Sequence, residues 1–211
     1  MVNITRVGLF FYDNIYNPYK NSIYYIEICL KGRFSMTKIK NDHLKFGNPD
    51  APLKIEAFIN VACPGTARIY RLAKEVLPPY IENNQVEVIV KLYDKPREEL
   101  IHGALIHWTL DNSNPKESLH VIAQLLETQS EWHEYSDKEL KRLLVDQYNL
   151  QEEERLENVD VSLAITAEAI EREVKIVPTI FFNGEKLLGF TYELEPSDLK
   201  QAVETALSKI S

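Results

Sequence analysis

The residues most able to do chemistry are Cys63, Pro64, Gly65 and Thr66, which follow one another in the chain. Residues 53–61 before them form an apolar, β-branched run that is typical of a buried strand. Pro64 suits the first position of a helix, where its missing N–H costs nothing. Free N–H groups and the positive end of a helix dipole favour an anion there, so Cys63 is predicted to be a reactive cysteine. Apolar residues then recur at helical spacing: Ile69, Leu72, Ala73, Val76 and Tyr80.

Thr66 decides which reactions are open to this cysteine. Its hydroxyl is expected to donate a charge-assisted hydrogen bond to a Cys63 thiolate and so to stabilise it. An alcohol is a far weaker nucleophile than a thiol at neutral pH, so Thr66 cannot attack a disulfide formed on Cys63. A second thiol must come from elsewhere, either from Cys29, the other cysteine of the chain, or from a small external thiol such as glutathione.

A second element with chemical potential is Val177-Pro178-Thr179, within the apolar run 174–182. A proline inside a run that otherwise reads as a strand indicates an edge, a bulge or a cis peptide bond. Asn183-Gly184 is a strong hairpin signal, and residues 185–190 would form the returning strand. An ordinary proline at a strand entrance is the simpler interpretation of Pro178.

The sequence around Cys63 resembles the DsbA-like branch of the thioredoxin superfamily. Residues 47–52, Gly-Asn-Pro-Asp-Ala-Pro, precede the first strand as they do in that family, and Cys63-Pro64 follows at the matching distance. The resemblance covers about residues 45–210. It implies an α/β thioredoxin-like fold with an α-helical insertion, and catalytic roles for Cys63, Pro64 and Thr66.

The resemblance also assigns a role to the second element. Val177, Pro178 and Thr179 match the family's cis-proline loop, which packs against the active-site cysteine. A substrate peptide would pair there with exposed backbone groups, as in strand addition. The chain departs from the family at Thr66, where relatives carry a second cysteine. Two further departures are positions at which relatives often have glycine, Glu173 and Ile176.

The other segments predict a βαβ unit followed by many helices. Residues 85–93 predict a second strand, parallel to the first, after Pro78-Pro79 end the first helix. Residues 96–172 predict one helix after another, too many for a single crossover, as in the helical insertion of DsbA-like proteins. Pro196-Ser197 is expected to begin the final helix.

Three residues are expected to cap helices within this helical segment. Asn114 precedes a proline, and Ser136 has Glu139 three residues further on, which is the pattern of a capping box. Asp160 is expected to cap the last helix. The inward face of that helix is predicted to carry Leu163, Ala164, Ala167 and Ile170.

Residues 1–35 differ from the rest of the chain. They hold four basic and two acidic side chains, a local charge of +2, so the remainder carries −10 of the total of −8. Two interpretations stay open: extra strands, or upstream sequence before a natural start at Met36. The predicted organisation is an N-terminal extension over 1–35 and a thioredoxin-like domain over 36–211.

Charge and composition restrict the binding partners, the compartment and the metal sites that are expected. A net charge of −8 disfavours nucleic acid and anionic membranes. The apolar start Val7–Phe11 is too short for a signal peptide, which favours the cytoplasm. Two cysteines cannot form a disulfide framework, in line with a reducing compartment. His102 and His107 do not share a helix face, so no metal site is expected.

The favoured interpretation is a cytoplasmic protein that exchanges thiols and disulfides of proteins or peptides through Cys63 alone. It needs no bound cofactor, and glutathione or another small thiol would be its co-substrate. A rival interpretation is a non-catalytic binding or adaptor protein that keeps the groove around Pro178. A third is a transferase-like enzyme that uses Cys63 and Thr66 to bind glutathione. The sequence identifies neither the substrate nor the oligomeric state.

Overall fold

The computed structural model describes residues 44–187 and 194–210. The chain separates into two units, Met1–Lys38 and Ile39–Ser211, and all described residues belong to the second. The expected N-terminal extension over 1–35, with Cys29, lies outside the described residues. So does the second half, residues 188–190, of the expected returning strand after Asn183-Gly184.

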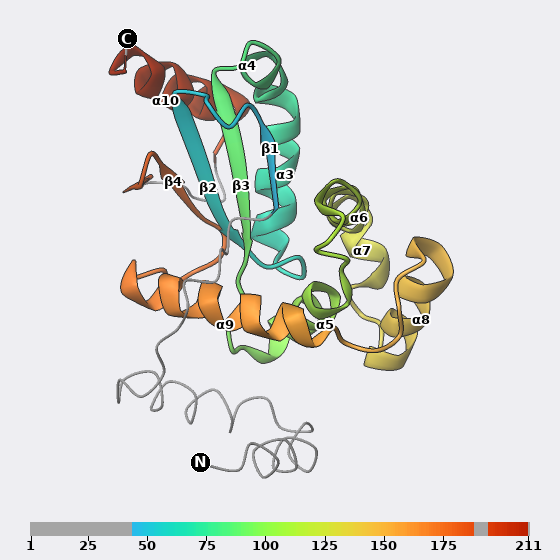
Figure 1. The fold of residues 1–211 in the computed structure, drawn as a ribbon. Coiled ribbons are helices and arrows are strands. Elements are labelled where there is room, and N and C mark those ends of the chain that lie inside the picture. Colours follow the sequence, from blue (N-terminus) through green and yellow to red (C-terminus); the bar gives the residue numbers. More distant parts are fainter. Residues whose placement is uncertain (1–43, 188–193, 211) are drawn as a thin grey trace, which may run out of the picture. The chain divides into compact units, whose positions relative to one another are not determined.

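One mixed sheet with the strand order β1-β3-β2-β4-β5 forms the centre of the described unit (Figure 1). β2 and β3 are parallel and linked through α3, which confirms the predicted βαβ unit. The other neighbouring strands pair antiparallel. The strands are β1 (Leu44–Gly47), β2 (Leu53–Ile59), β3 (Val86–Leu92), β4 (Thr179–Phe182) and β5 (Glu185–Lys186).

β4 is shorter than the apolar run 174–182 predicted. It begins at Thr179, directly after Pro178, because a proline has no N–H to donate to a neighbouring strand. The predicted hairpin is confirmed. Asn183 and Gly184 both have positive φ, 47° and 85°, which suits the tight turn between β4 and β5.

Helices fill the segment between β3 and β4, as the sequence predicted. They are the 3₁₀ helix η1 (Glu98–Leu100), α5 (Ile101–Thr109), α6 (Pro115–Glu127), α7 (Gln129–Trp132), α8 (Asp137–Tyr148) and α9 (Leu156–Glu171). The remaining helices are α3 (Pro64–Val76), α4 (Pro78–Glu82) and α10 (Pro196–Ser208). The mixed α/β fold expected from the sequence is therefore confirmed.

The two faces of the sheet have separate cores. Residues that alternate along the strands, such as Ile55, Val88 and Phe182, pack with α3, α6 and α10 in the larger core. Phe58 and Phe181 point to the opposite face, where they pack with Ile165 and Ala169 of α9. The period of two along each strand thus sends its side chains into different layers.

Some of the helix caps and ends predicted from the sequence are confirmed by the structure. Asn114 caps α6, and Ser136 forms the predicted capping box with Glu139 at the start of α8. Pro78-Pro79 end α3 as predicted but also begin α4, because a proline fits the first turn of a helix. The predicted cap at Asp160 is wrong, since α9 already begins at Leu156.

The predicted inward face of α9 is also wrong in part. Ile170 is 51% exposed, whereas Ser162, Ile165 and Ala169 are buried. Asn158, near the start of the helix, is buried as well and donates to carbonyl oxygens at the end of α5. The inward face of α9 carries polar side chains that bind buried partners. A prediction from the spacing of apolar residues alone therefore assigned this face incorrectly.

Candidate active site

Cys63 lies where β2 gives way to α3 and is the N-cap of that helix. Its carbonyl oxygen accepts hydrogen bonds from the N–H groups of Thr66 at 2.9 Å and Ala67 at 3.3 Å. Pro64 occupies the first turn of the helix, as predicted. The thiol therefore sits at the N-terminus of a 13-residue helix, where backbone N–H groups are free of helical partners.

The thiol contacts the loop that leads into β4. Cys63 Sγ donates to the carbonyl oxygen of Val177 at 3.3 Å, across 114 positions of sequence. The Val177–Pro178 peptide bond is cis. Thr179 is buried, and its hydroxyl donates to the carbonyl oxygen of Ile176 at 2.7 Å, which closes the loop. The fold thus brings both sequence elements together.

Thr66 does not make the expected contact. Its side chain is buried, with 2% of the residue exposed, and its hydroxyl has no hydrogen-bond partner among the described residues. The expected hydrogen bond to Cys63 is therefore wrong. The backbone of Thr66 faces the cysteine through its N–H, while the side chain lies on the buried face of α3. Residue 66 thus supplies neither a second thiol nor a hydrogen bond to the thiol of Cys63.

A comparison with known families identifies the family of this domain. Residues 39–205 match the family model described as thioredoxin. The chain belongs to this thioredoxin family. No curated protein matches the chain.

Solved structures share the fold of this thioredoxin family member. A conserved protein of unknown function from Enterococcus faecalis is 28% identical, with 80% of this chain and 93% of that chain covered and a TM-score of 0.68. Alpha-DsbA1 from Wolbachia pipientis is 16% identical, with 82% and 94% covered and a TM-score of 0.62. Oxidised BdbD from Bacillus subtilis is 17% identical, with 81% and 95% covered and a TM-score of 0.56. The DsbA-like fold expected from the sequence is confirmed.

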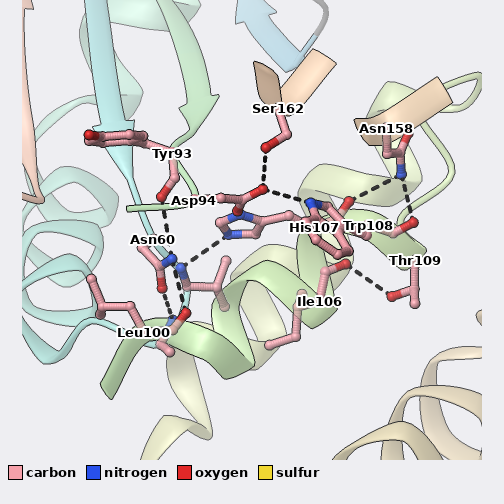
Figure 2. Close-up of polar contacts among 12 residues, drawn as sticks. Asn60, Tyr93, Asp94, Leu100, Ile106, His107, Trp108, Thr109, Asn158 and Ser162 are labelled. Carbon is pink, nitrogen blue, oxygen red and sulfur yellow. Dashed lines mark hydrogen bonds and ion pairs between the residues drawn. The ribbon is translucent and has the colours of Figure 1, made fainter. Parts of the chain in front are cut away.

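Asn60 braces the turn that carries the cysteine (Figure 2). The Asn60 residue is fully buried, and its Oδ1 accepts the N–H of Ala62 at 3.0 Å. Its Nδ2 donates to the carbonyl oxygens of Tyr93 and Leu100, both at 3.3 Å. Gly103 makes room for it, because a Cβ there would lie 1.9 Å from Asn60 Oδ1. The turn is thus tied to the end of β3 and the start of α5.

Gln129 braces the same turn from α7. Its Nε2 donates to the carbonyl oxygens of Val61 at 2.6 Å and Cys63 at 3.2 Å. The residue is buried, so water does not compete for these bonds. Sequence reasoning missed Gln129 and Asn60. Their partners lie as far as 68 residues away in sequence, so no local spacing reveals them.

Three aromatic side chains of the helical segment, those of Trp108, Trp132 and Tyr135, have different surroundings. Trp132 is buried and donates from Nε1 to the carbonyl oxygen of Leu125 at 2.9 Å, which makes it part of the packing of the helical segment. Trp108 donates to Asp94 at 2.7 Å. Tyr135 is 38% exposed. None of these interactions reaches Cys63.

Lys95 is a cation near the site that the sequence did not single out. Its ammonium donates to the carbonyl oxygen of Lys175, two residues before Val177. Partial burial and the Arg97 guanidinium lower the pKa of Lys95, whereas the negative charges of Glu99 and a Cys63 thiolate oppose that shift. The positive charge of Lys95 is therefore bound to the segment that leads into the Val177 loop, whose carbonyl oxygen contacts the thiol.

Lys95→Met is expected to slow alkylation of Cys63 by iodoacetate about threefold and to leave alkylation by uncharged iodoacetamide almost unchanged. The reason is that Lys95 attracts the anionic reagent. Rates measured at low and high salt check this, because salt should erase the difference. Arg97→Met is the control, since Arg97 is exposed and pairs with Glu99 at 3.4 Å. Equal slowing with both reagents would exclude a charge effect.

A buried ion cluster lies on the α9 face of the sheet. Arg172 binds both carboxylate oxygens of Glu56, at 2.7 and 2.9 Å, and Glu168 at 2.7 Å. Lys91 binds Glu56 at 2.7 Å and also pairs with Glu168. The guanidinium of Arg172 lies 3.8 Å from the centre of the Phe181 ring. Two acids and two bases thus link α9 to β2 and β3.

The cluster sets the ionisation of Glu56. Burial acts to raise the pKa of Glu56, but the hydrogen bonds and charges of Arg172 and Lys91 outweigh it and hold that pKa below its ordinary value. Burial acts to lower the pKa of Arg172, and Glu56 and Glu168 raise it instead. Glu56 and Arg172 are therefore each held in their ionised forms by their partners in the cluster.

No group of three or more His, Cys, Asp or Glu residues is placed to hold a metal ion within 44–187 and 194–210. In the same ranges, every helix is too short or too polar to cross a membrane.

Proposed function

We propose that this thioredoxin family member exchanges thiols and disulfides with Cys63 as its single nucleophile, and that an external small thiol completes the reaction. The observation that carries the proposal is the contact between Cys63 Sγ and the carbonyl oxygen of Val177, made at the N-terminus of α3. Thr66 stands where a resolving thiol would be needed, and it offers only a hydroxyl.

The reaction divides into two exchanges. The Cys63 thiolate attacks one sulfur of a substrate disulfide, whose S–S bond breaks as the other sulfur leaves as a thiolate and takes a proton from water. The thiolate of an external thiol such as glutathione then attacks the substrate sulfur of the mixed disulfide. Cys63 leaves as a thiolate, and the substrate now carries a disulfide to the external thiol. Electrons and protons balance without a bound cofactor.

The proposed substrates are proteins or peptides with disulfides. The loop at Val177 and Pro178 supports this, since an extended peptide could pair with the backbone beside the thiol. Thr179 would hold the base of that loop through its bond to Ile176. The mechanism needs a supply of reduced small thiol, so the proposal includes a reducing compartment such as the cytoplasm.

One observation favours the rival function, a binding or adaptor protein without redox chemistry. Cys63 is only 6% exposed, which is low for a nucleophile that must meet a bulky substrate. An adaptor would use the same loop to hold a peptide and would not need the thiol. The two functions therefore differ in whether Cys63 is required.

The test is the turnover of a peptide that carries a glutathione mixed disulfide, with reduced glutathione in excess. The proposal expects wild-type protein to release free peptide about tenfold or more above the rate of glutathione alone, since Cys63 provides a positioned nucleophile. Cys63→Ser should give only the rate of glutathione alone. Binding of the peptide by Cys63→Ser without any rate enhancement by the wild type would favour the adaptor.

A further inference from the structure

His107 is a buried residue that the proposed exchange does not use directly, yet it touches the turn of the nucleophile (Figure 2). The residue is 3% exposed and comes from α5. Its Nε2 lies 3.3 Å from the backbone nitrogen of Val61, two residues before Cys63. A backbone N–H can only donate, so Nε2 accepts this bond and carries no hydrogen. The hydrogen of the neutral ring is therefore on Nδ1.

Asp94 selects this tautomer. Its Oδ1 lies 2.5 Å from His107 Nδ1 and accepts the ring hydrogen. Its Oδ2 accepts hydrogen bonds from Trp108 Nε1 at 2.7 Å and Ser162 Oγ at 2.5 Å. The carboxylate thus has donors on both oxygens, from α5 and α9. These contacts fix the ring so that its accepting nitrogen faces Val61.

The contact matters because the Val61 N–H is buried. The Val61 residue is fully buried in the turn between β2 and α3, where water does not replace a lost acceptor. Gln129 holds the carbonyl of the same residue from α7. Without the imidazole acceptor, the turn would have to shift to satisfy this N–H, and the thiol two residues later would shift with it.

We infer that His107 is a positioning residue for Cys63, and that its Nδ1–H tautomer, fixed by Asp94, holds the thiol against the carbonyl oxygen of Val177. The inference rests on the proposed function in taking Cys63 as the nucleophile. It makes the helical segment a part of the active site, since α5 sets the geometry of a residue at the start of α3.

Two substitutions of His107 separate its two bonds. Glutamine places its amide near the position of Nε2 and can accept the Val61 N–H. Asparagine reaches only the position of Nδ1, so it keeps the contact to Asp94 and leaves the Val61 N–H without an acceptor. His107→Asn is expected to slow alkylation of Cys63 by iodoacetamide about tenfold, whereas His107→Gln should stay within about twofold of wild type.

Alkylation is followed by peptide mass spectrometry, which gives the rate for Cys63 separately from the rate for Cys29. Leu144→Ala is the control for stability, because it removes a buried side chain of α8. It should lower the melting temperature and leave the alkylation rate unchanged. Equal rates for His107→Asn and wild type would overturn the inference. Equal slowing by His107→Asn and His107→Gln would also overturn it, because the acceptor would then not matter.

Asp94→Asn tests the tautomer and also covers the case in which His107→Asn does not fold. Its amide oxygen can still accept from Trp108 and Ser162, which leaves its NH₂ group facing His107. The ring hydrogen must then move to Nε2, where it opposes the Val61 N–H. Alkylation about tenfold slower is expected, and a wild-type rate in folded protein would refute the inference.

A second probe separates this inference from the proposed function. 2,2′-Dipyridyl disulfide reports disulfide exchange, whereas iodoacetamide reports only the position and reactivity of the thiol. Wild-type protein that forms no mixed disulfide, together with the expected alkylation rates of the His107 variants, would refute the proposed function alone. A mixed disulfide in all variants, with alkylation rates that do not differ, would refute the His107 inference alone.

Discussion

Thr66→Cys is expected to shed a glutathione adduct from Cys63 without any added thiol, at least about a hundredfold faster than wild type. In the wild type, no residue of the α3 turn can attack the mixed disulfide, because Thr66 carries an alcohol. A cysteine at position 66 would attack it within the protein, and the effective concentration of that thiol is far above that of a dilute external one.

The geometry supports an internal disulfide in this variant. Thr66 lies in the first turn of α3 and its N–H bonds to the carbonyl of Cys63 at 2.9 Å. Two cysteines at this spacing in one turn lie within bridging distance. Thr66 is buried and its hydroxyl makes no hydrogen bond among the described residues, so replacing it with a thiol breaks no bond there.

The measurement follows the mass of the purified adduct over time. Thr66→Ser is the matched control, since it keeps a hydroxyl and should hold the adduct as the wild type does. Release of the adduct at the same rate from wild type and Thr66→Cys would mean that position 66 does not block resolution. The single-thiol mechanism would then be wrong, and the adaptor function would be preferred.

Arg172→Met is expected to lower the free energy of unfolding by about 3–5 kcal/mol. Arg172 binds Glu56 and Glu168 and stacks on the ring of Phe181. Its removal leaves two largely buried carboxylates with Lys91 as their remaining partner in the cluster. The cost comes from leaving a buried negative charge without its cation.

Denaturant unfolding measures this loss. Lys200→Met is the control, because Lys200 and Glu204 form an exposed pair at 3.9 Å, which should contribute about 0.5 kcal/mol or less. The double variant Glu168→Gln, Arg172→Met should recover part of the loss, since one buried charge is then removed together with its partner. A loss from Arg172→Met no larger than that from Lys200→Met would refute the role of the cluster.

The same cluster predicts a pH dependence. The pKa of Glu56 is held below its ordinary value of 4.5 in the folded protein. A group with a depressed folded pKa contributes stability above its unfolded pKa and loses it as the pH falls through the folded pKa. The difference in unfolding free energy between wild type and Arg172→Met should therefore shrink below about pH 4.5. A difference that grows on acidification would contradict the assigned shift.

Local patterns in the sequence account for the parts of the fold that were predicted correctly. The alternation along β2 and β3, Pro64 at a helix start and the Ser136 capping box each depend on near neighbours in the chain. α9 was harder to predict because its inward face carries Asn158 and Ser162. Their partners are carbonyls at the end of α5 and the carboxylate of Asp94, which apolar spacing cannot reveal.

The candidate site shows the same limit. Cys63 and the loop at Val177 could be found from motifs, and the fold brings them to 3.3 Å. The hydrogen bond expected from the Thr66 hydroxyl is absent, because a spacing of three residues fixes the backbone hydrogen bonds of a helix start but not the rotamer of a side chain. His107 carries no local signal, since its backbone partner lies 46 residues earlier in the chain.

The single-thiol mechanism is tested most simply by the mass of wild-type protein that has been treated with oxidised glutathione and then freed of small molecules. One glutathione adduct is expected, on Cys63 and not on Cys29, and it should persist until dithiothreitol or another thiol is added. A Cys63 that gains no adduct while the protein is folded, or an adduct that leaves without any added thiol, would contradict that mechanism.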